Sequence, residues 1–210
     1  MASDPVEFGL VASLSRPGAN ITGATFYTVL LGGKRLELLR ELVPKASTIA
    51  VFANTKNPVS VTELKDVESA APKLGLRVRV LAASNLNEIG AAFQTLASAR
   101  VDGIYLSADP IYYSYRTEIA ALAARHGLPA ISGDRDFAQA GGLSSYGASR
   151  SDAYRQAGLY VGRILKGEKP SDLPVVQPTR FELLINLKTA RGLGLVVGPT
   201  VLASADDIIE

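Results

Sequence analysis

Polar side chains stand just after several short apolar runs of this chain, and together they could hold a small polar ligand. A carboxylate can bind an ammonium group, an arginine with serine hydroxyls can bind a carboxylate, and a tyrosine ring can pack against an apolar part. The candidate ligand-binding residues are Asn54, Asp109, Tyr112, Asp134, Arg135, Ser145 and Tyr146. Each also has a local explanation. Asp109 before Pro110, for example, has the pattern of a helix N-cap followed by proline at the first helical position.

Catalytic chemistry is poorly supported, and we expect no enzyme activity. The chain has no cysteine, no Gly-x-Ser-x-Gly pattern, and a single histidine, His126, far in sequence from Ser144 and Ser145. Two carboxylates two residues apart, Asp134 and Asp136, would diverge at a helix start, where they fit an N-cap and a first-turn charge.

The sequence predicts neither a metal nor a cofactor. His126 lies at an expected helix C-terminus, where capping is the simpler role, because histidine metal sites normally gather several ligands. The glycines of 192–198 are spaced one residue too far apart for a dinucleotide fingerprint and follow a helix instead of a strand. Gly32-Gly33-Lys34 lacks the upstream glycine and the following Ser or Thr of a P-loop.

The elements that must position these residues alternate between strands and helices. We expect strands at 48–52, 77–81, 103–106 and 129–131, with a weaker one at 143–146. Helical 3-and-4 spacing of apolar residues fills the intervals between them. This alternation predicts a doubly wound parallel sheet over residues 23–146, and in such a sheet ligands bind outside the carboxyl ends of the strands. The candidate residues follow those ends.

The flanking segments have their own patterns. Residues 4–20 contain a short helical pattern, 151–166 a longer amphipathic helix, 180–186 a strand and 187–191 a short helix. Pro72 lies in the last turn of its helix, so we expect a kink or an early end there.

Composition excludes several classes of protein. The 210 residues include 22 Lys or Arg and 20 Asp or Glu, a net charge of +2 with no long basic block, which argues against nucleic-acid binding. Apolar residues make up 47%, enough for a sizeable core, yet no run approaches the roughly 18 apolar residues of a membrane span. The first residues also lack the basic and apolar regions of a signal peptide.

Long strings of the chain resemble bacterial ABC-transporter substrate-binding proteins, the group that includes tryptophan- and tyrosine-type binders. The strings that carry the resemblance are 4–6, 9–23, 34–44, 54 with 57–58, 126–130, 141–147, 164–174, 181–190 and 205–210. They extend over the whole chain, and strings of this length are far more specific than a short motif.

The resemblance implies a type I periplasmic-binding-protein fold, in which two α/β lobes joined by hinge strands close on a ligand. It implies a small amino-acid-like ligand, with aromatic amino acids among the candidates, an ABC permease as partner, and a periplasmic or membrane-anchored extracellular location. Members of the family carry a signal peptide and a first lobe on the order of a hundred residues before the segment that opens this chain. We therefore expect mainly the second lobe.

The expected domain organisation follows from that implication. Residues 23–146 and 171–210 would form the ligand-binding lobe, and 1–22 and 147–170 would pack on the first lobe. The apolar face of the helix within 149–166 (Tyr154, Ala157, Val161 and Ile164) would then lack its native partner. We expect this face to pack on a second copy of the chain, as a homodimer, or on the remaining lobe.

Two other functions remain open at this stage. A ligand-sensing domain of a transcriptional regulator can have the same fold, and a helix-turn-helix before Asp4 would favour it, whereas a signal peptide would favour transport. An α/β enzyme, flavodoxin-like or an isomerase, is disfavoured because no nucleophile–base pair is evident.

Overall fold

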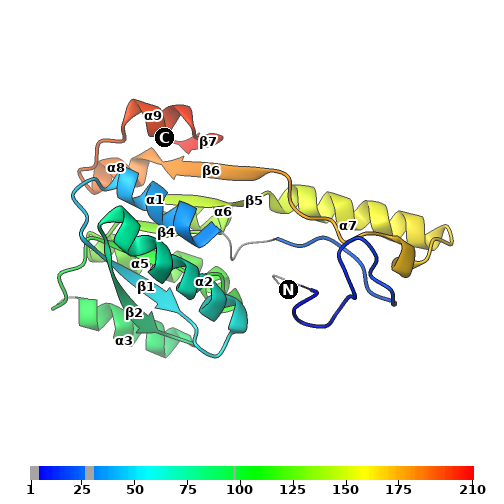
Figure 1. The fold of residues 1–210 in the computed structure, drawn as a ribbon. Helices are drawn as coiled ribbons and strands as arrows, with labels where there is room; N and C mark the ends of the chain where they lie inside the picture. The colour runs from blue at the N-terminus through cyan, green and yellow to red at the C-terminus, as the bar shows by residue number, and fades with distance from the viewer. Residues whose placement is uncertain (1–4, 27–30, 97) are drawn as a thin grey trace. The chain divides into compact units, whose positions relative to one another are not determined.

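The computed structural model describes residues 5–26, 31–96 and 98–210, which form two compact units (Figure 1). The larger unit comprises residues 31–147 and 182–210, and the smaller comprises 5–26 and 148–181, apart from the undescribed residue 97. All the candidate ligand-binding residues lie in the larger unit.

A seven-stranded sheet forms the larger unit, in the order β2-β1-β3-β4-β5-β6-β7. The strands are β1 (Thr48–Ala53), β2 (Arg77–Ala82), β3 (Gly103–Leu106), β4 (Ala130–Ser132), β5 (Ser144–Ala148), β6 (Phe181–Asn186) and β7 (Asp207–Ile209). Strands β1 to β5 pair in parallel, which confirms the predicted parallel arrangement for this part of the sheet.

The last two strands run the other way, so the whole sheet is mixed, but both lie outside residues 23–146, for which a parallel sheet was predicted. Asn186 N–H donates to Leu143 O and Ser149 N–H donates to Arg180 O, so residue numbers rise along β5 while they fall along β6. Strand β7 pairs in parallel with β6 and shares its direction. Strand β7 and the short helix before it were absent from the sequence-based expectation.

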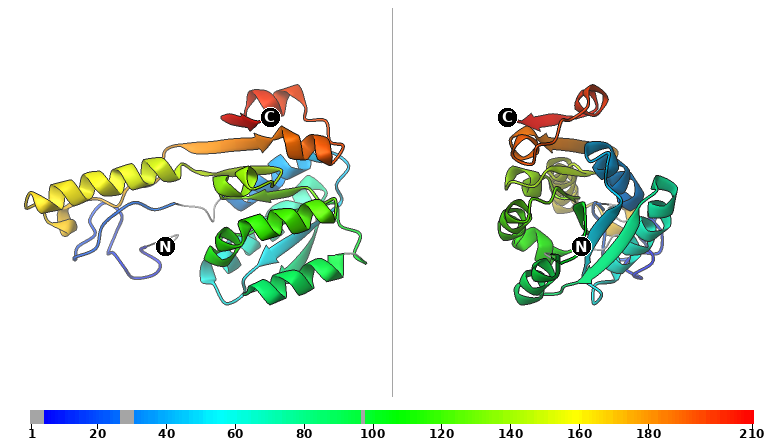
Figure 2. Two further views of the ribbon diagram at one scale, coloured as in Figure 1. Left: turned by 180° about the vertical axis from the view of Figure 1, so that it is seen from behind. Right: turned by 90° about the vertical axis from the view of Figure 1, so that its left-hand side faces the viewer.

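Helices cover both faces of the sheet, as the end-on view in Figure 2 shows. They are α1 (Gly32–Leu42), α2 (Pro58–Ala70), α3 (Leu86–Leu96), α4 (Pro110–Ser114), α5 (Arg116–Arg125), α6 (Arg135–Gln139), α8 (Leu187–Gly192) and α9 (Pro199–Ala203). Alternate residues of β1 face opposite sides: Ile49 and Val51 join the hydrophobic cluster that contains α1, while Ala50 and Phe52 join the one that contains α3. The two clusters form the core of a doubly wound domain.

Local signals in the sequence explain several helix ends. Helix α2 stops at Ala70 and continues as a 3-10 turn, Ala71–Leu74, because Pro72 has no N–H to donate, which confirms the expected early end. Gly75 then closes the turn with a φ of 68°, a left-handed conformation that favours glycine. His126 is the C-cap of α5, as predicted.

The smaller unit contains the longest described helix, α7 (Arg150–Leu165), and a 3-10 turn, Pro170–Asp172. The predicted helix within 4–20 is wrong for the described residues, because 5–20 form turns and bends. Gly9 has a φ of 66° and its N–H donates to Val6 O, a turn hydrogen bond in place of the helical one.

The predicted assignment of segments to two lobes stays a prediction, and the two compact units differ from it slightly in extent. Residues 23–26 and 171–181 belong to the smaller unit. The physical reason is that these segments pair with each other: Ala24 forms a β-bridge with Val176, and the Thr22 hydroxyl donates to Leu173 O at 2.6 Å.

Candidate functional site

Asn54 and Asp109 follow β1 and β3, and the structure brings them together at the carboxyl edge of the sheet. Asn54 Nδ2 donates to Asp109 Oδ2 at 2.9 Å, and Asn57 Nδ2 donates to the same oxygen at 2.7 Å. The other oxygen, Oδ1, accepts from Ile111 N at 2.8 Å and caps α4, so the predicted N-cap is confirmed. Asp109 therefore ties the loops after β1 and β3 to each other.

Two buried serines support the same edge. Ser60 Oγ accepts from Asn54 N at 2.9 Å and lies 2.5 Å from Ser107 Oγ. Because Ser60 is on α2 and Ser107 follows β3, this contact holds the first turn of α2 next to the end of β3.

Tyr112 lies in the core. Its ring is buried and meets Phe52 edge-on, with 6.4 Å between ring centroids. Its hydroxyl donates to Ala83 O at 2.7 Å. Burial raises the pKa of the Tyr112 phenol far above its usual value, and the negative charge of Asp109 adds to the effect. The Tyr112 ring therefore anchors α4 to the hydrophobic core. Its contact with a ligand remains a prediction.

Asp134 and Arg135 stand at the start of α6. The Asp134 side chain accepts from Asp136 N at 3.4 Å, which confirms its predicted N-cap role. Arg135 reaches β6 and β7 instead, with an ion pair to Glu182 at 3.5 Å and a second, very close one to Asp207. The predicted carboxylate-binding arginine is thus engaged by two carboxylates of the chain.

Ser145 and Tyr146 are neighbours on β5, so their side chains point to opposite faces of the sheet. Ser145 is fully buried and aligns with Ser132 of β4. Tyr146 is half-buried and packs against the cluster that contains α1, while its backbone carbonyl accepts from Arg35 Nε at 2.6 Å.

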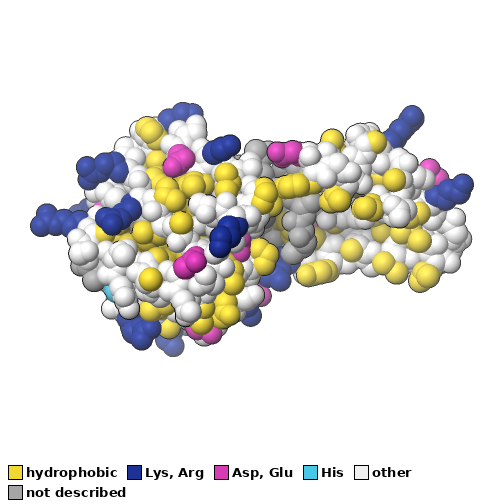
Figure 3. All heavy atoms as spheres, turned by 90° about the horizontal axis from the view of Figure 1, so that it is seen from below, with side chains coloured by type: hydrophobic (Ala, Val, Ile, Leu, Met, Phe, Trp, Pro, Cys, Tyr) yellow, Lys and Arg dark blue, Asp and Glu magenta, His cyan; other side chains and the backbone are white. Residues whose placement is uncertain are grey.

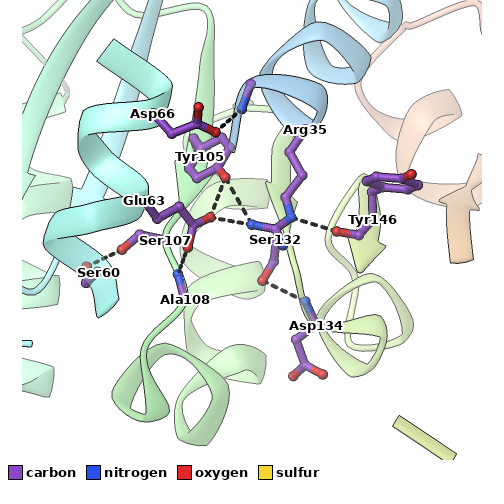
Figure 4. Close-up of polar contacts among 11 residues, drawn as sticks. Arg35, Ser60, Glu63, Asp66, Tyr105, Ser107, Ala108, Ser132, Asp134 and Tyr146 are labelled. Atoms are coloured by element: carbon purple, nitrogen blue, oxygen red, sulfur yellow. Dashed lines mark hydrogen bonds and ion pairs between the residues drawn. The ribbon is translucent and has the colours of Figure 1, made fainter. Parts of the chain in front are cut away.

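A buried polar network beneath this edge was missed by the sequence analysis. Figure 4 shows Arg35 of α1, Glu63 of α2 and Tyr105 of β3 in mutual contact. Glu63 Oε1 accepts very short hydrogen bonds from Arg35 Nη1 and the Tyr105 hydroxyl, and Oε2 accepts from Ala108 N at 2.7 Å. All three side chains are 0% exposed. We call this set the Arg35–Glu63–Tyr105 network.

The ionisation of this network follows from its burial. Burial raises the pKa of Glu63, against the lowering effect of the Arg35 charge and the hydrogen bonds from Tyr105 and Ala108. Burial also raises the pKa of Tyr105 well above its usual value, and the adjacent Glu63 charge acts in the same direction. The phenol therefore stays protonated and donates a hydrogen bond to Glu63.

A signal for the network was present in the sequence. Arg35 precedes Leu38, Leu39 and Leu42 at spacings of three, four and seven, which places it on the buried face of α1. Glu63 is likewise in phase with Ser60 and Val67 on α2. A charged residue in phase with an apolar stripe indicates a buried partner, but spacing alone did not say which one.

Other chemistry has little support in the described part of the chain. Its His, Asp and Glu residues form no group of three that could hold a metal ion. Among the same residues, no helix is both long enough and apolar enough to cross a bilayer.

Comparisons with known proteins place this geometry in context. Residues 1–209 match the model of the family described as ABC transporter substrate binding protein. A curated relative, a tyrosine-binding protein of Clostridioides difficile (strain R20291), is 29% identical over 193 residues, which cover 92% of this chain and 55% of that protein. The chain thus spans about half the length of this relative.

Solved structures agree over nearly the whole chain. An ABC domain from Streptococcus pneumonia in complex with L-Trp is 28% identical with a TM-score of 0.88, over 98% of this chain and 69% of that one. A ligand-free, open substrate-binding protein with adhesive properties from Clostridium difficile is 26% identical with a TM-score of 0.72, over 98% and 68%. More distant structures, including a LacI-family regulator at 20% identity, share the fold alone. The fold is that of type I periplasmic-binding proteins.

Proposed function

Because the chain belongs to the ABC transporter substrate-binding protein family, we propose that the protein carrying it binds an amino acid, with aromatic amino acids first, and delivers it to an ABC permease. The observation that carries this proposal is the family match over residues 1–209. The names of two relatives, a tyrosine-binding protein and an L-Trp complex, favour the aromatic class.

The carboxyl edge of the sheet supports the proposal chemically. The Asp109 carboxylate has about four acceptor positions, and two side-chain amides with one backbone N–H occupy three of them. In the proposal, the remaining position accepts from the ligand's ammonium group. Asn54 and Asn57 hold the carboxylate in place and supply further polar atoms beside it.

Arg135 is the proposed partner for the ligand's carboxylate. Its side chain is 35% exposed and that of Asp207 is 50% exposed, and an ion pair in contact with water contributes only about 0–1 kcal/mol. A ligand carboxylate can therefore replace Asp207 at little cost. The half-buried Tyr146 completes the proposed wall of the site, and the buried Asp134, Ser145 and Tyr112 pack behind that wall.

For the smaller unit, we propose that α7 is covered in the full protein. None of the described α7 residues is buried, and Tyr154 and Val161 are 61% and 56% exposed. Hydrophobic side chains are spread over the face of this unit seen in Figure 3. The proposed cover is a first lobe of the kind its longer relatives have, or a second copy of the chain.

Relatives that are binding proteins, and not enzymes, support a transport role without catalysis. The location that fits this role is the periplasm or the outer face of a membrane. A ligand-sensing regulator is the weaker alternative, since the likeness to such proteins extends to the fold alone. DNA binding by the full protein would favour it.

A thermal-shift screen tests the proposal. The protein that carries this chain is mixed with L-tryptophan, L-tyrosine, the other amino acids and a set of sugars, and hits are measured by calorimetry. A ligand that binds only the folded state raises the thermal midpoint. At a concentration of 100 Kd, it stabilises the folded state by about 2.7 kcal/mol. Absence of a shift with every amino acid contradicts the proposal, and a shift with sugars alone redirects it.

A further inference from the structure

The Arg35–Glu63–Tyr105 network buries two charged side chains completely, which is unusual in a small domain. A buried ion pair contributes little net stability, because removing two charges from water cancels most of their attraction, and apolar side chains of similar volume often serve as well. Arg35 and Glu63 are nonetheless both fully buried, between α1 and α2. Stability alone does not explain this choice of residues.

Each partner of the pair also makes a hydrogen bond to a backbone group at or beside a candidate site residue. Glu63 Oε2 accepts from Ala108 N, the residue directly before Asp109. Arg35 Nε donates to the carbonyl of Tyr146, in the middle of β5. The backbone of Tyr146, and that of Ala108 next to Asp109, are therefore held from inside the domain, one through each partner of the ion pair.

The guanidinium of Arg35 also packs on the loop between them. A Cβ added at Gly133 would lie 2.8 Å from Arg35 Nη2, so this loop, which follows β4 and leads to Asp134, approaches the guanidinium as only a glycine permits. Figure 4 shows Arg35 between Glu63 and Tyr146, with Asp134 on the neighbouring loop. One buried pair thus touches the chain after β3, after β4 and within β5.

We propose that Arg35 and Glu63 are positioning residues of the ligand site: from inside the domain, they fix the positions of the loops that carry Asp109 and Asp134 relative to the segment of β5 that carries Tyr146. The inference rests on the proposed function, because it gives these loops a ligand to bind. Tyr105 has a smaller part. Its hydroxyl contacts the two charged side chains, at 3.1 Å from Arg35 Nη1, and both contacts lie within the network.

The main test compares affinity with stability in the full protein. In Glu63→Gln, one oxygen remains to accept the hydrogen bonds that two oxygens now accept from Arg35, Tyr105 and Ala108. The variant should therefore bind L-tryptophan, or the amino acid that the wild type prefers, about tenfold or more weakly. Tyr105→Phe should weaken it by less than about threefold. The matched control is Ile49→Ala, a core truncation at the amino end of β1, chosen to lower the thermal midpoint without touching the loops.

A second variant covers the case in which Glu63→Gln fails to fold. The double substitution Arg35→Met with Glu63→Met removes both charges at similar volume, an exchange that often preserves folding. We expect it to keep a cooperative thermal transition and to lose affinity as Glu63→Gln does. Amide hydrogen exchange without ligand should rise in peptides covering 106–112 and 143–148, and should not rise there in Ile49→Ala.

The outcomes separate the two proposals. Equal affinity losses in Glu63→Gln and Ile49→Ala at matched midpoints, or unchanged affinity in the double variant, overturn the positioning role. A wild type that binds no amino acid defeats the proposed function. In that case the exchange measurement still decides whether the pair holds the loops: unchanged exchange in both peptides overturns this inference as well.

Discussion

Asn54 and Asp109 are 55 positions apart in the sequence, yet their side chains share a hydrogen bond of 2.9 Å. The contact joins the loops after β1 and β3, two strands that lie side by side in the sheet. Because Asp109 also caps α4, one carboxylate sets both the helix start and the spacing of the two loops. The stability of the site and its geometry are therefore coupled at this residue.

Replacing Asp109 with alanine should destabilise the domain and weaken ligand binding together. The variant loses an N-cap and leaves two side-chain amides without their shared acceptor, which should lower the free energy of unfolding by about 2 kcal/mol. Urea denaturation and calorimetric titration measure the two effects. Glu68→Ala, an exposed change on α2, is the control and should alter neither. Wild-type stability in Asp109→Ala would contradict the structural role described.

Arg135→Ala should weaken binding of amino acids through the loss of its contact with the ligand's carboxylate alone. The ion pairs of Arg135 are partly exposed, so its loss should change the free energy of unfolding by less than about 1 kcal/mol. Affinity for L-tryptophan should fall by about tenfold, whereas affinity for L-tryptophan amide, which has no carboxylate, should be nearly unchanged. Equal losses for both ligands would show that Arg135 does not bind the carboxylate.

Gly147→Ala should be severely destabilising. A Cβ at this position would overlap the carbonyl oxygen of Gly133, a backbone atom that cannot move without shifting the loop before α6. We expect a loss of about 3 kcal/mol or failure to fold. Gly90→Ala in α3 has open space around the new methyl and should instead raise stability by up to about 1 kcal/mol. Comparing the two midpoints checks the prediction.

Asp102 should make a pH-dependent contribution to stability. Burial opposes ionisation, but hydrogen bonds from Ser47 N and Thr48 N outweigh it and lower the pKa of Asp102 below its usual value. A carboxyl group with a lowered pKa in the folded state stabilises the protein above its unfolded-state pKa, and this stabilisation is lost as the pH falls through the folded-state value. The cost of Asp102→Ala, about 1 kcal/mol near neutral pH, should therefore shrink as the pH falls through the lowered folded-state pKa of Asp102. A pH-independent difference in midpoint would contradict this linkage.

The exposed face of α7 should make this 210-residue chain self-associate when it is produced alone. We expect light scattering to show a concentration-dependent dimer, and Val161→Lys to shift it to the monomer with little loss of stability, because Val161 is exposed. Lys166→Glu, beyond the end of α7, is the control. A strict monomer at all concentrations would reject the homodimer and leave a first lobe as the proposed cover.

Much of the larger unit could be predicted from the sequence because the patterns that indicate its strands and helices are local. Strand β3 lies where its apolar run indicated, and Asp109 and Asp134 cap helices as their positions before Pro110 and Asp136 suggested. The meeting of Asn54 with Asp109 at one edge also followed from parallel pairing. Each of these features depends on residues within a few positions, or on a rule that holds for every sheet of this class.

By itself, the sequence determined the alternation of strands and helices, the helix caps and the edge at which polar residues gather, since these depend on spacings of two to four residues. Only the tertiary structure decided that β6 and β7 run against the other strands, that Tyr112 points into the core, and that Arg35 meets Glu63. Strand direction and the pairing of buried charges are set by partners distant in the chain, so the spacing can place Arg35 and Glu63 on buried helix faces without showing that they meet.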